Sequence, residues 1–179
     1  MSKTVQLHDL FFDAYIDETK IQKRVKELGA TLAKEFKGKK PVFLAILNGS
    51  FIFAADLVRA CNIDHETSFI KLTSYEGTSS TGIVTTQIGL QEDISNRPVI
   101  IVEDIIDTGT TIYNFLPTLK ELNPQSISIV TLLLKPSALK YPLHIDHIGF
   151  EIPNKFVVGY GLDYNGLGRN LKSVYQLKE

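Results

Sequence analysis

The segment Val99–Thr111 reads VIIVEDIIDTGTT and decides the fold. The apolar, β-branched run Val99–Val102 predicts a buried strand, and the small hydroxyl residues around Gly109 predict a loop that opens a helix. Ligands collect beyond the carboxyl ends of parallel strands, and a helix N-terminus offers free N–H groups. We therefore expect this loop to cradle a phosphate monoester. Its residues are Asp107, Thr108, Gly109, Thr110 and Thr111.

Two acidic residues, Glu103 and Asp104, come just before the predicted phosphate loop, with Ile105 and Ile106 between. Two carboxylates beside a bound anion repel that anion, so another group has to balance their charge. A vicinal diol, which donates two hydrogen bonds, would do so, and so would a divalent cation. A ribose 5-phosphate offers the diol and the phosphate together. The alternative is a pair of capping or surface acids beside an ordinary strand-to-helix turn, which this unbroken order of residues disfavours.

The flanking sequence repeats the alternation of strand and helix. Apolar runs predict strands at 42–47 and 126–134, and helical spacing of apolar residues predicts helices over 20–40, 51–60 and 112–122. Pro117 lies inside the last helix, where we expect a kink or a restart. Such alternation predicts an α/β fold with a mostly parallel central sheet flanked by helices, in a single domain over residues 1–179.

The composition excludes several classes of protein. The chain has 179 residues, 44% hydrophobic and 22% charged, and its formal charge of −1 does not suit a protein that coats nucleic acid. The lone Cys61 can form neither an internal disulfide nor a thiolate metal site, which favours a reducing compartment. The N-terminal residues hold no apolar signal segment, so we expect a cytoplasmic protein. No apolar run approaches the length of a membrane span. Small molecules are therefore the expected partners, with no nucleic acid and no membrane.

A polar stretch at 73–82 reads TSYEGTSSTG and predicts an exposed loop. Loops of this length often cover a binding site. A plain hairpin connection between HETSFIKL and IVTTQI fits the composition equally well, so the sequence leaves both interpretations open.

Taken together, these motifs resemble those of the hypoxanthine-guanine phosphoribosyltransferases. VIIVEDIIDTGTT is similar to that family's binding motif for phosphoribosyl diphosphate, and the other matching segments keep the family's order. They are LNGSFIFAADL, SY in the polar loop, LLLKPS and FEIPNKFVVGYGLDYN. The resemblance covers most of the chain, from LNGSFIFAADL onward.

The resemblance implies a fold, a reaction and a cofactor. The fold is that of the type I phosphoribosyltransferases, with a small hood built from the N-terminal segment and the region around 140–179. The reaction is the Mg²⁺-dependent transfer of the phosphoribosyl group from phosphoribosyl diphosphate to N9 of hypoxanthine or guanine, in purine salvage. The substrates are thus small molecules, and the family's habit implies a homodimer or homotetramer.

The resemblance also implies roles for single residues. Asp107 matches the acceptor of the proton from purine N7 and is the implied catalytic residue. The remaining positions match sites for the diphosphate (Asn48, Gly49 and Arg169), the purine (Lys135, Phe156, Val157 and Asp163), the metal (Glu103, Asp104 and Asp163) and a lid (Ser74 and Tyr75). Without the family, Lys135 would be a solvated strand-end lysine, Phe156 a core residue, and Asp163 with Arg169 a surface ion pair.

One position departs from the family pattern. Many relatives carry Lys or Arg where this chain has Asn48, so the diphosphate turn here would rely on backbone amides. The family also implies a cis peptide bond at Leu47–Asn48.

Two other functions fit the sequence less well. A regulator that senses nucleotides and binds nucleic acid would need a basic surface, which the charge of −1 does not supply. A phosphoaspartate phosphatase would space its acids by one residue, whereas two residues separate Asp104 from Asp107.

Overall fold

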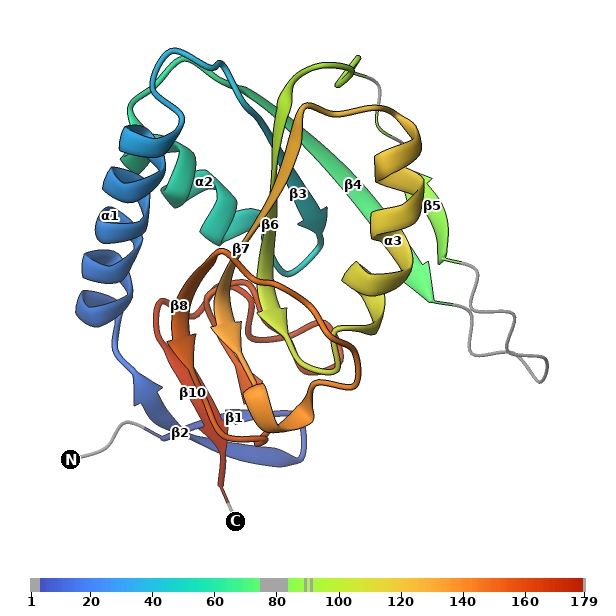
Figure 1. Ribbon diagram of the computed structural model, residues 1–179. Helices are drawn as coiled ribbons and strands as arrows, with labels where there is room; N and C mark the ends of the chain where they lie inside the picture. The colour runs from blue at the N-terminus through green and yellow to red at the C-terminus, as the bar shows by residue number, and fades with distance from the viewer. Residues whose placement is uncertain (1–3, 75–83, 89, 91, 179) are drawn as a thin grey trace.

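The computed structural model describes residues 4–74, 84–88, 90 and 92–178, and the described chain forms two β-sheets (Figure 1). The larger sheet has six strands in the order β5-β4-β3-β6-β7-β8. Five of them run parallel, and β5 pairs antiparallel with β4 at one edge. The strands are β3 (Val42–Leu47), β4 (Glu66–Ser74), β5 (Val84–Ile88), β6 (Pro98–Ile106), β7 (Ser126–Leu134) and β8 (His147–Glu151). The predicted mostly parallel sheet is confirmed.

Strand β6 is longer than the sequence predicted. The apolar run ends at Val102, but pairing with β7 continues to Ile106, opposite Leu134. The ladder is made by backbone groups and does not require apolar side chains. Glu103 and Asp104 therefore belong to the strand, which does not end at Val102 as the apolar run predicted.

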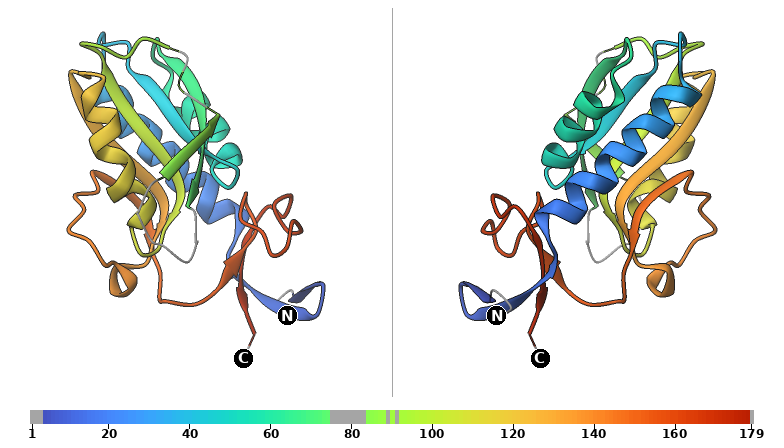
Figure 2. Two further views of the ribbon diagram at one scale, coloured as in Figure 1. Left: turned by 90° about the vertical axis from the view of Figure 1, so that its right-hand side faces the viewer. Right: turned by 90° about the vertical axis from the view of Figure 1, so that its left-hand side faces the viewer.

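Helices cover both faces of the larger sheet (Figures 1 and 2). α1 (Glu18–Glu35) and α2 (Phe51–Cys61) share one hydrophobic core with the sheet, and α3 (Thr110–Glu121) shares the other. Gly29 lets α1 and α2 touch, because a Cβ there would lie 2.6 Å from Cβ of Ala60. α1 ends before the predicted residue 40. α3 runs on through Pro117 as one helix, without the expected restart.

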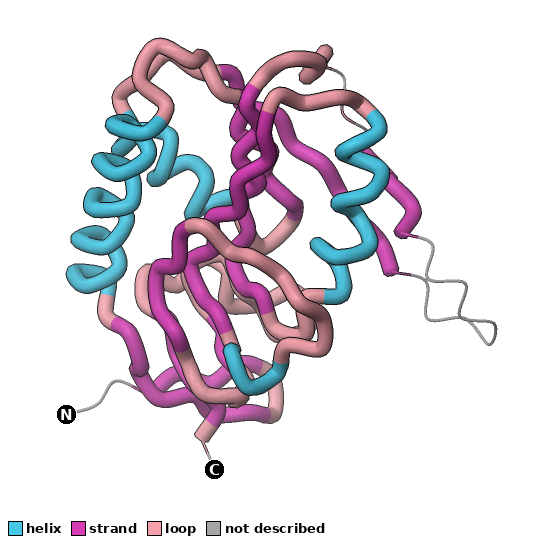
Figure 3. The backbone as a smooth tube through the Cα atoms, in the orientation of Figure 1, coloured by secondary structure: helices cyan, strands magenta, loops and turns pink. Residues whose placement is uncertain are grey.

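The smaller sheet joins the two ends of the described chain. Its order is β1-β2-β10-β9, all antiparallel, and its core holds Phe12, Val158 and Tyr175. The strands are β1 (Thr4–Leu7), β2 (Leu10–Ile16), β9 (Val157–Val158) and β10 (Val174–Leu177). The side views and the backbone tube place this sheet beyond the carboxyl ends of the parallel strands (Figures 2 and 3). It is the expected hood.

Among the described residues, no helix combines the length and the apolar character that crossing a membrane requires.

Candidate active site

Three loops meet at the carboxyl edge of the larger sheet, which faces the hood. Asn48 follows β3, Asp107 follows β6 and Lys135 follows β7, and these strands are neighbours in the sheet. The topology thus brings together residues that are up to 87 positions apart in the sequence, since 135 − 48 = 87. Parallel sheets bind their ligands at this edge.

The predicted phosphate loop joins β6 to α3. Gly109 has φ of 76°, a left-handed conformation that suits glycine, and α3 begins at the next residue. The Thr108 and Thr110 hydroxyl oxygens lie 2.9 Å apart. The loop lines a small cavity of about 100 Å³ together with Glu103. Free amides at the start of a twelve-residue helix, flanked by hydroxyls, suit an anion.

The two acids of β6 lie on either side of the strand, because successive side chains of a strand point to opposite faces. Glu103 lines the small cavity at the phosphate loop, whereas Asp104 lines a larger cavity of about 280 Å³. Both are buried, with 9% and 8% of their surface exposed. Burial raises the pKa of Asp104 to about 6, and burial with the nearby Asp104 charge raises the pKa of Glu103 well above its usual range.

Glu103 also has an unpaired atom. Its buried Oε2 has no hydrogen-bond partner among the described residues. An unpartnered carboxyl oxygen costs free energy unless a ligand supplies a donor. This observation fits the expected hydroxyl groups of a sugar.

The larger cavity brings most of the predicted site together. Asp107 and Lys135 form an ion pair there, with 2.8 Å between Lys135 Nζ and Asp107 Oδ2. Lys135 is buried, with only 5% of its surface exposed, so it is not a solvated strand-end lysine. The Asp107 side chain remains 45% exposed toward solvent. The cavity lining is Gly49, Asp104, Ile105, Asp107, Lys135, Phe156, Val157, Leu162, Asp163 and Arg169.

Phe156 is an exposed aromatic residue at the mouth of this cavity. With 42% of its surface exposed, it is not the core residue that its position in FVVGY suggests by default. Its ring is supported by Phe12 at 6.0 Å and by Tyr164 at 5.9 Å between centroids. One side of the ring is thus braced by the hood, an arrangement that suits stacking with a flat ligand.

Asp163 and Arg169 close the cavity on the hood side. Arg169 Nη2 lies 2.7 Å from Asp163 Oδ1, and its Nη1 donates to the carbonyl of Gly161 at 2.7 Å. Asp163 Oδ2 in turn accepts the backbone N–H of Gly166 at 2.7 Å. Both side chains are less than one third exposed, so this pair is more ordered than an ordinary surface salt bridge.

The Asn48–Gly49 turn packs tightly against these groups. A Cβ on Gly49 would lie 1.6 Å from Asp104 Oδ2, and a Cβ on Gly161 would lie 2.0 Å from the carbonyl oxygen of Gly49. Only glycine fits at either position. The peptide bond Leu47–Asn48 is cis, as the resemblance implied. Asn48 itself is exposed.

The comparisons with known proteins agree with this geometry. The family model described as "Phosphoribosyl transferase domain" matches residues 13–165. A hypoxanthine phosphoribosyltransferase from Buchnera aphidicola is 47% identical over 152 residues, which are 83% of this chain and 86% of that protein.

The chain belongs to the phosphoribosyltransferase family. Two further matches extend over almost its whole length. A hypoxanthine-guanine-xanthine phosphoribosyltransferase from Tritrichomonas foetus is 38% identical over 100% of this chain and 98% of its own. The crystal structure of a hypoxanthine phosphoribosyltransferase from Staphylococcus aureus has a TM-score of 0.88 at 42% identity, and the match covers 92% of this chain and 90% of that one. The predicted type I phosphoribosyltransferase fold is confirmed.

Magnesium is a cofactor that this family implies, and the residues present can be tested for it. Among the described residues, no group of three or more His, Cys, Asp or Glu side chains forms a metal site. Asp104 and Asp163 nevertheless line the same cavity. Mg²⁺ in enzymes keeps several waters and takes one or two carboxylates with substrate phosphates, so this pair fits. Glu103, the third predicted ligand, lines the neighbouring cavity instead.

The predicted lid lies at the limit of the described chain. Ser74 is the last residue of β4, and Tyr75 lies outside the described residues. The antiparallel pairing of β4 with β5 confirms that the polar segment connects a hairpin.

The sequence analysis missed several supporting residues of this phosphoribosyltransferase. Tyr160 is buried and donates to Asp56 of α2 at 2.6 Å, which ties the Gly161 loop to the helix that follows the Asn48 turn. Tyr164 donates to Asp9 in the β1–β2 turn at 2.9 Å. The position of Tyr164 next to Asp163 in the sequence could have indicated that Tyr164 supports the site. Its partner could not be predicted, because 155 residues separate them.

Proposed function

We propose that this phosphoribosyltransferase transfers the phosphoribosyl group of phosphoribosyl diphosphate to N9 of hypoxanthine or guanine. The products are inosine or guanosine monophosphate and diphosphate, and the reaction salvages purines. The observation that carries the proposal is the ion pair between the buried Lys135 and the partly exposed Asp107, at 2.8 Å. The 6-oxo group and N7 are neighbours on a purine, so one base can meet both side chains.

The purine end of the site binds the base through specific contacts. The Lys135 ammonium donates to the 6-oxo group, and Phe156 stacks on the ring. Val157 offers its backbone to the pairing edge of the base. Asp107 accepts the proton from N7 as N9 bonds to the sugar, and its exposed side chain leaves room for that contact.

The phosphate end holds the sugar phosphate. The amides and hydroxyls of Thr108–Thr111 bind the 5-phosphate, and Glu103 and Asp104 accept hydrogen bonds from the ribose hydroxyls. The bond from carbon 1 to diphosphate breaks with oxocarbenium character, so the nearby carboxylates also favour the developing positive charge.

The leaving diphosphate lies between the two ends. The backbone amides of Asn48 and Gly49 and the guanidinium of Arg169 stabilise its negative charge. Asp104 and Asp163 would hold Mg²⁺, with Glu103 close by at the ribose. When bound, the metal neutralises charge on the departing diphosphate. In the free protein Arg169 is already paired with Asp163, and this ion pair keeps the guanidinium group of Arg169 in position.

Other parts of the proposal concern the whole protein. Residues 1–179 act as one phosphoribosyltransferase domain, and Ser74 and Tyr75 cover the site during the reaction and exclude water. The protein works as a homodimer or homotetramer in the cytoplasm. The single Cys61, buried and with a pKa raised by burial to about 11, suits a reducing compartment.

The direct assay is the release of diphosphate when phosphoribosyl diphosphate and Mg²⁺ are mixed with a base. We expect release with hypoxanthine and with guanine, and none when the base is omitted or the metal is chelated. The expected nucleotide has to appear in equal amount. The absence of turnover with any 6-oxopurine at millimolar concentration would refute the proposed reaction.

A further inference from the structure

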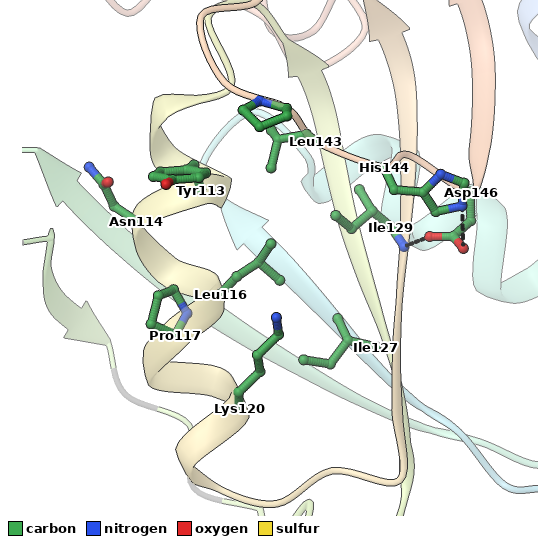
Figure 4. A pocket seen from close by; sticks show the side chains of 11 residues that line it. Tyr113, Asn114, Leu116, Pro117, Lys120, Ile127, Ile129, Leu143, His144 and Asp146 are labelled. Carbon is green, nitrogen blue, oxygen red and sulfur yellow. Dashed lines mark hydrogen bonds and ion pairs between the residues drawn. The ribbon is translucent and has the colours of Figure 1, made fainter.

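A further cavity lies on the face of the larger sheet that α3 covers, opposite the face covered by α1 and α2. Its volume is about 550 Å³, roughly twice that of the candidate active site. Figure 4 shows it between α3 and the segment 142–146, with Ile127 and Ile129 of β7 behind it. This volume lies in the range of pockets that enclose drug-sized molecules. None of its lining residues lines the candidate active site.

The lining combines an apolar floor with a few polar groups at its edge. Leu116 of α3, Ile129 of β7 and Leu143 supply apolar surface. The ring of Tyr113 stands at one end, held by stacking on Tyr141 at 4.3 Å between centroids. An apolar body with convergent polar groups is the usual composition of a small-molecule site.

Lys120 is the group in this cavity that can bind an anion. Asp146 is already engaged, because its Oδ2 accepts the N–H of Ile129 at 2.8 Å and its Oδ1 lies 3.5 Å from His144 Nε2. Lys120 has no ion-pair partner in the described part of the chain, and Figure 4 shows its side chain beside Leu116. Lys120 therefore offers an ammonium group without an ion-pair partner next to apolar surface, while the Asp146 carboxylate is held by its hydrogen bond to Ile129.

The walls of the cavity continue into the phosphate loop. The backbone N–H of Lys140 donates to the carbonyl of Thr108 at 3.0 Å. Leu143 lies directly on Gly109, since a Cβ added there would come 2.6 Å from Leu143 Cδ1. The opposite wall is α3, which begins at the next residue of the loop. A molecule in the cavity would therefore press on the two elements that hold the loop in place.

We propose that this cavity binds a small amphipathic anion, with an apolar body against Leu116, Ile129 and Leu143 and its acidic group on Lys120. Occupancy supports Leu143 against Gly109 and so tightens the binding of phosphoribosyl diphosphate. By linkage, phosphoribosyl diphosphate tightens the binding of the anion to the same degree. The site is separate from the proposed reaction, because its ligand does not enter the cavity of Lys135 and Asp107.

The probe is anilinonaphthalene sulfonate, which carries an aromatic body and one anionic group and fluoresces in apolar sites. We expect saturable binding that Lys120→Met weakens about fivefold or more, while Lys34→Met, in the last turn of α1, leaves it unchanged. Leu116→Trp, which adds volume to the apolar floor from a half-buried position, removes the binding. Equal binding by wild type and Lys120→Met would overturn the site.

Two further readouts separate this site from its alternatives. If phosphoribosyl diphosphate displaces the probe, the probe binds in the active site and the proposal is overturned. If the affinity for the probe falls as the protein concentration rises, the cavity is a contact between copies of the chain, and the proposal is overturned as well. In assays, saturating probe should lower the KM for phosphoribosyl diphosphate about fivefold in wild type and not in Lys120→Met. An unchanged wild-type KM would overturn the coupling. The fluorescence titration needs no turnover, so it is independent of the proposed reaction.

Discussion

The phosphate end and the purine end of the site are built in different ways. The phosphate end is contiguous, because Glu103–Thr111 runs from β6 through one loop into α3. The purine end collects Lys135, Phe156 and Asp163 from separate segments and braces them with the hood. A local motif fixes the first, whereas tertiary packing fixes the second. Substitutions in each should therefore affect different kinetic constants.

The largest effect is expected at Asp107, where the two ends meet. Asp107→Asn keeps the shape of the side chain but removes the proton acceptor, so turnover should fall about 100- to 10,000-fold. The Kd of phosphoribosyl diphosphate should change far less, as measured by calorimetric titration. Asp64→Asn, in the turn before β4 at the opposite end of the sheet, is the matched control. Equal losses in turnover and binding would reassign Asp107 to the phosphate end.

Gly49→Ala should break the contact between the two ends. The added methyl group would overlap Asp104 Oδ2 at 1.6 Å and push the turn or the carboxylate away. Overpacking of this kind costs about 1–3 kcal/mol, so we expect kcat/KM for phosphoribosyl diphosphate to fall about 10- to 100-fold. Gly38→Ala is the control for a glycine away from the site: nothing lies within 4 Å of its Cβ position, but its φ of 75° makes alanine strained there, so stability should fall while kcat/KM stays unchanged. Normal kinetics in the Gly49 variant would show that the turn does not need this close approach.

Asp104→Asn, at the phosphate end, should raise the stability of the protein at neutral pH and weaken the binding of phosphoribosyl diphosphate. Burial raises the pKa of Asp104 to about 6 from its ordinary value of 3.8, so between these pH values the folded protein holds a proton that the unfolded chain has released. Stability from this group is present at low pH and is lost as the pH rises through about 6. At neutral pH the variant should gain about 1–2 kcal/mol, or a few degrees in Tm, and the gain should vanish near pH 4.

Thermal melts across this pH range measure the gain, and a pH-independent Tm difference would contradict the burial argument. The same variant should bind phosphoribosyl diphosphate more weakly in the presence of Mg²⁺.

The smallest effect is expected from Phe156→Leu at the purine end. Loss of an aromatic stacking partner costs about 0.5–1.5 kcal/mol, so the KM for the base should rise about two- to tenfold. The KM for phosphoribosyl diphosphate should not change. Phe11→Leu, at another exposed phenylalanine of the hood, should leave both constants unchanged. A shift in the constant for phosphoribosyl diphosphate would mean that the two ends are not independent.

The same contrast explains what the sequence could predict. Strands 42–47 and 126–134, the loop between a strand and a helix at 107–111, and the mostly parallel sheet all follow from local patterns, and the structure has them. The end of β6 was misplaced, because backbone pairing with β7 carries two acids into the strand. The burial of Glu103 and Asp104 on opposite faces followed from that strand, not from their residue types.

The purine end needed more than local patterns. From the residues alone, Lys135 was a solvated lysine and Phe156 a core residue, and only the family resemblance gave them other roles. Burial of Lys135 depends on the pairing of β7 with β6, and the exposed position of Phe156 depends on the hood. The contact of Asp9 with Tyr164 joins residues 155 positions apart, which no local pattern reveals.

The central claim is that the Lys135–Asp107 cavity recognises a 6-oxopurine. The most direct test measures kcat/KM for hypoxanthine, guanine, xanthine and adenine with saturating phosphoribosyl diphosphate and Mg²⁺. We predict that hypoxanthine and guanine react at least about 100-fold more efficiently than adenine, whose 6-amino group cannot accept from a buried ammonium. Use of adenine as efficiently as hypoxanthine would contradict the account.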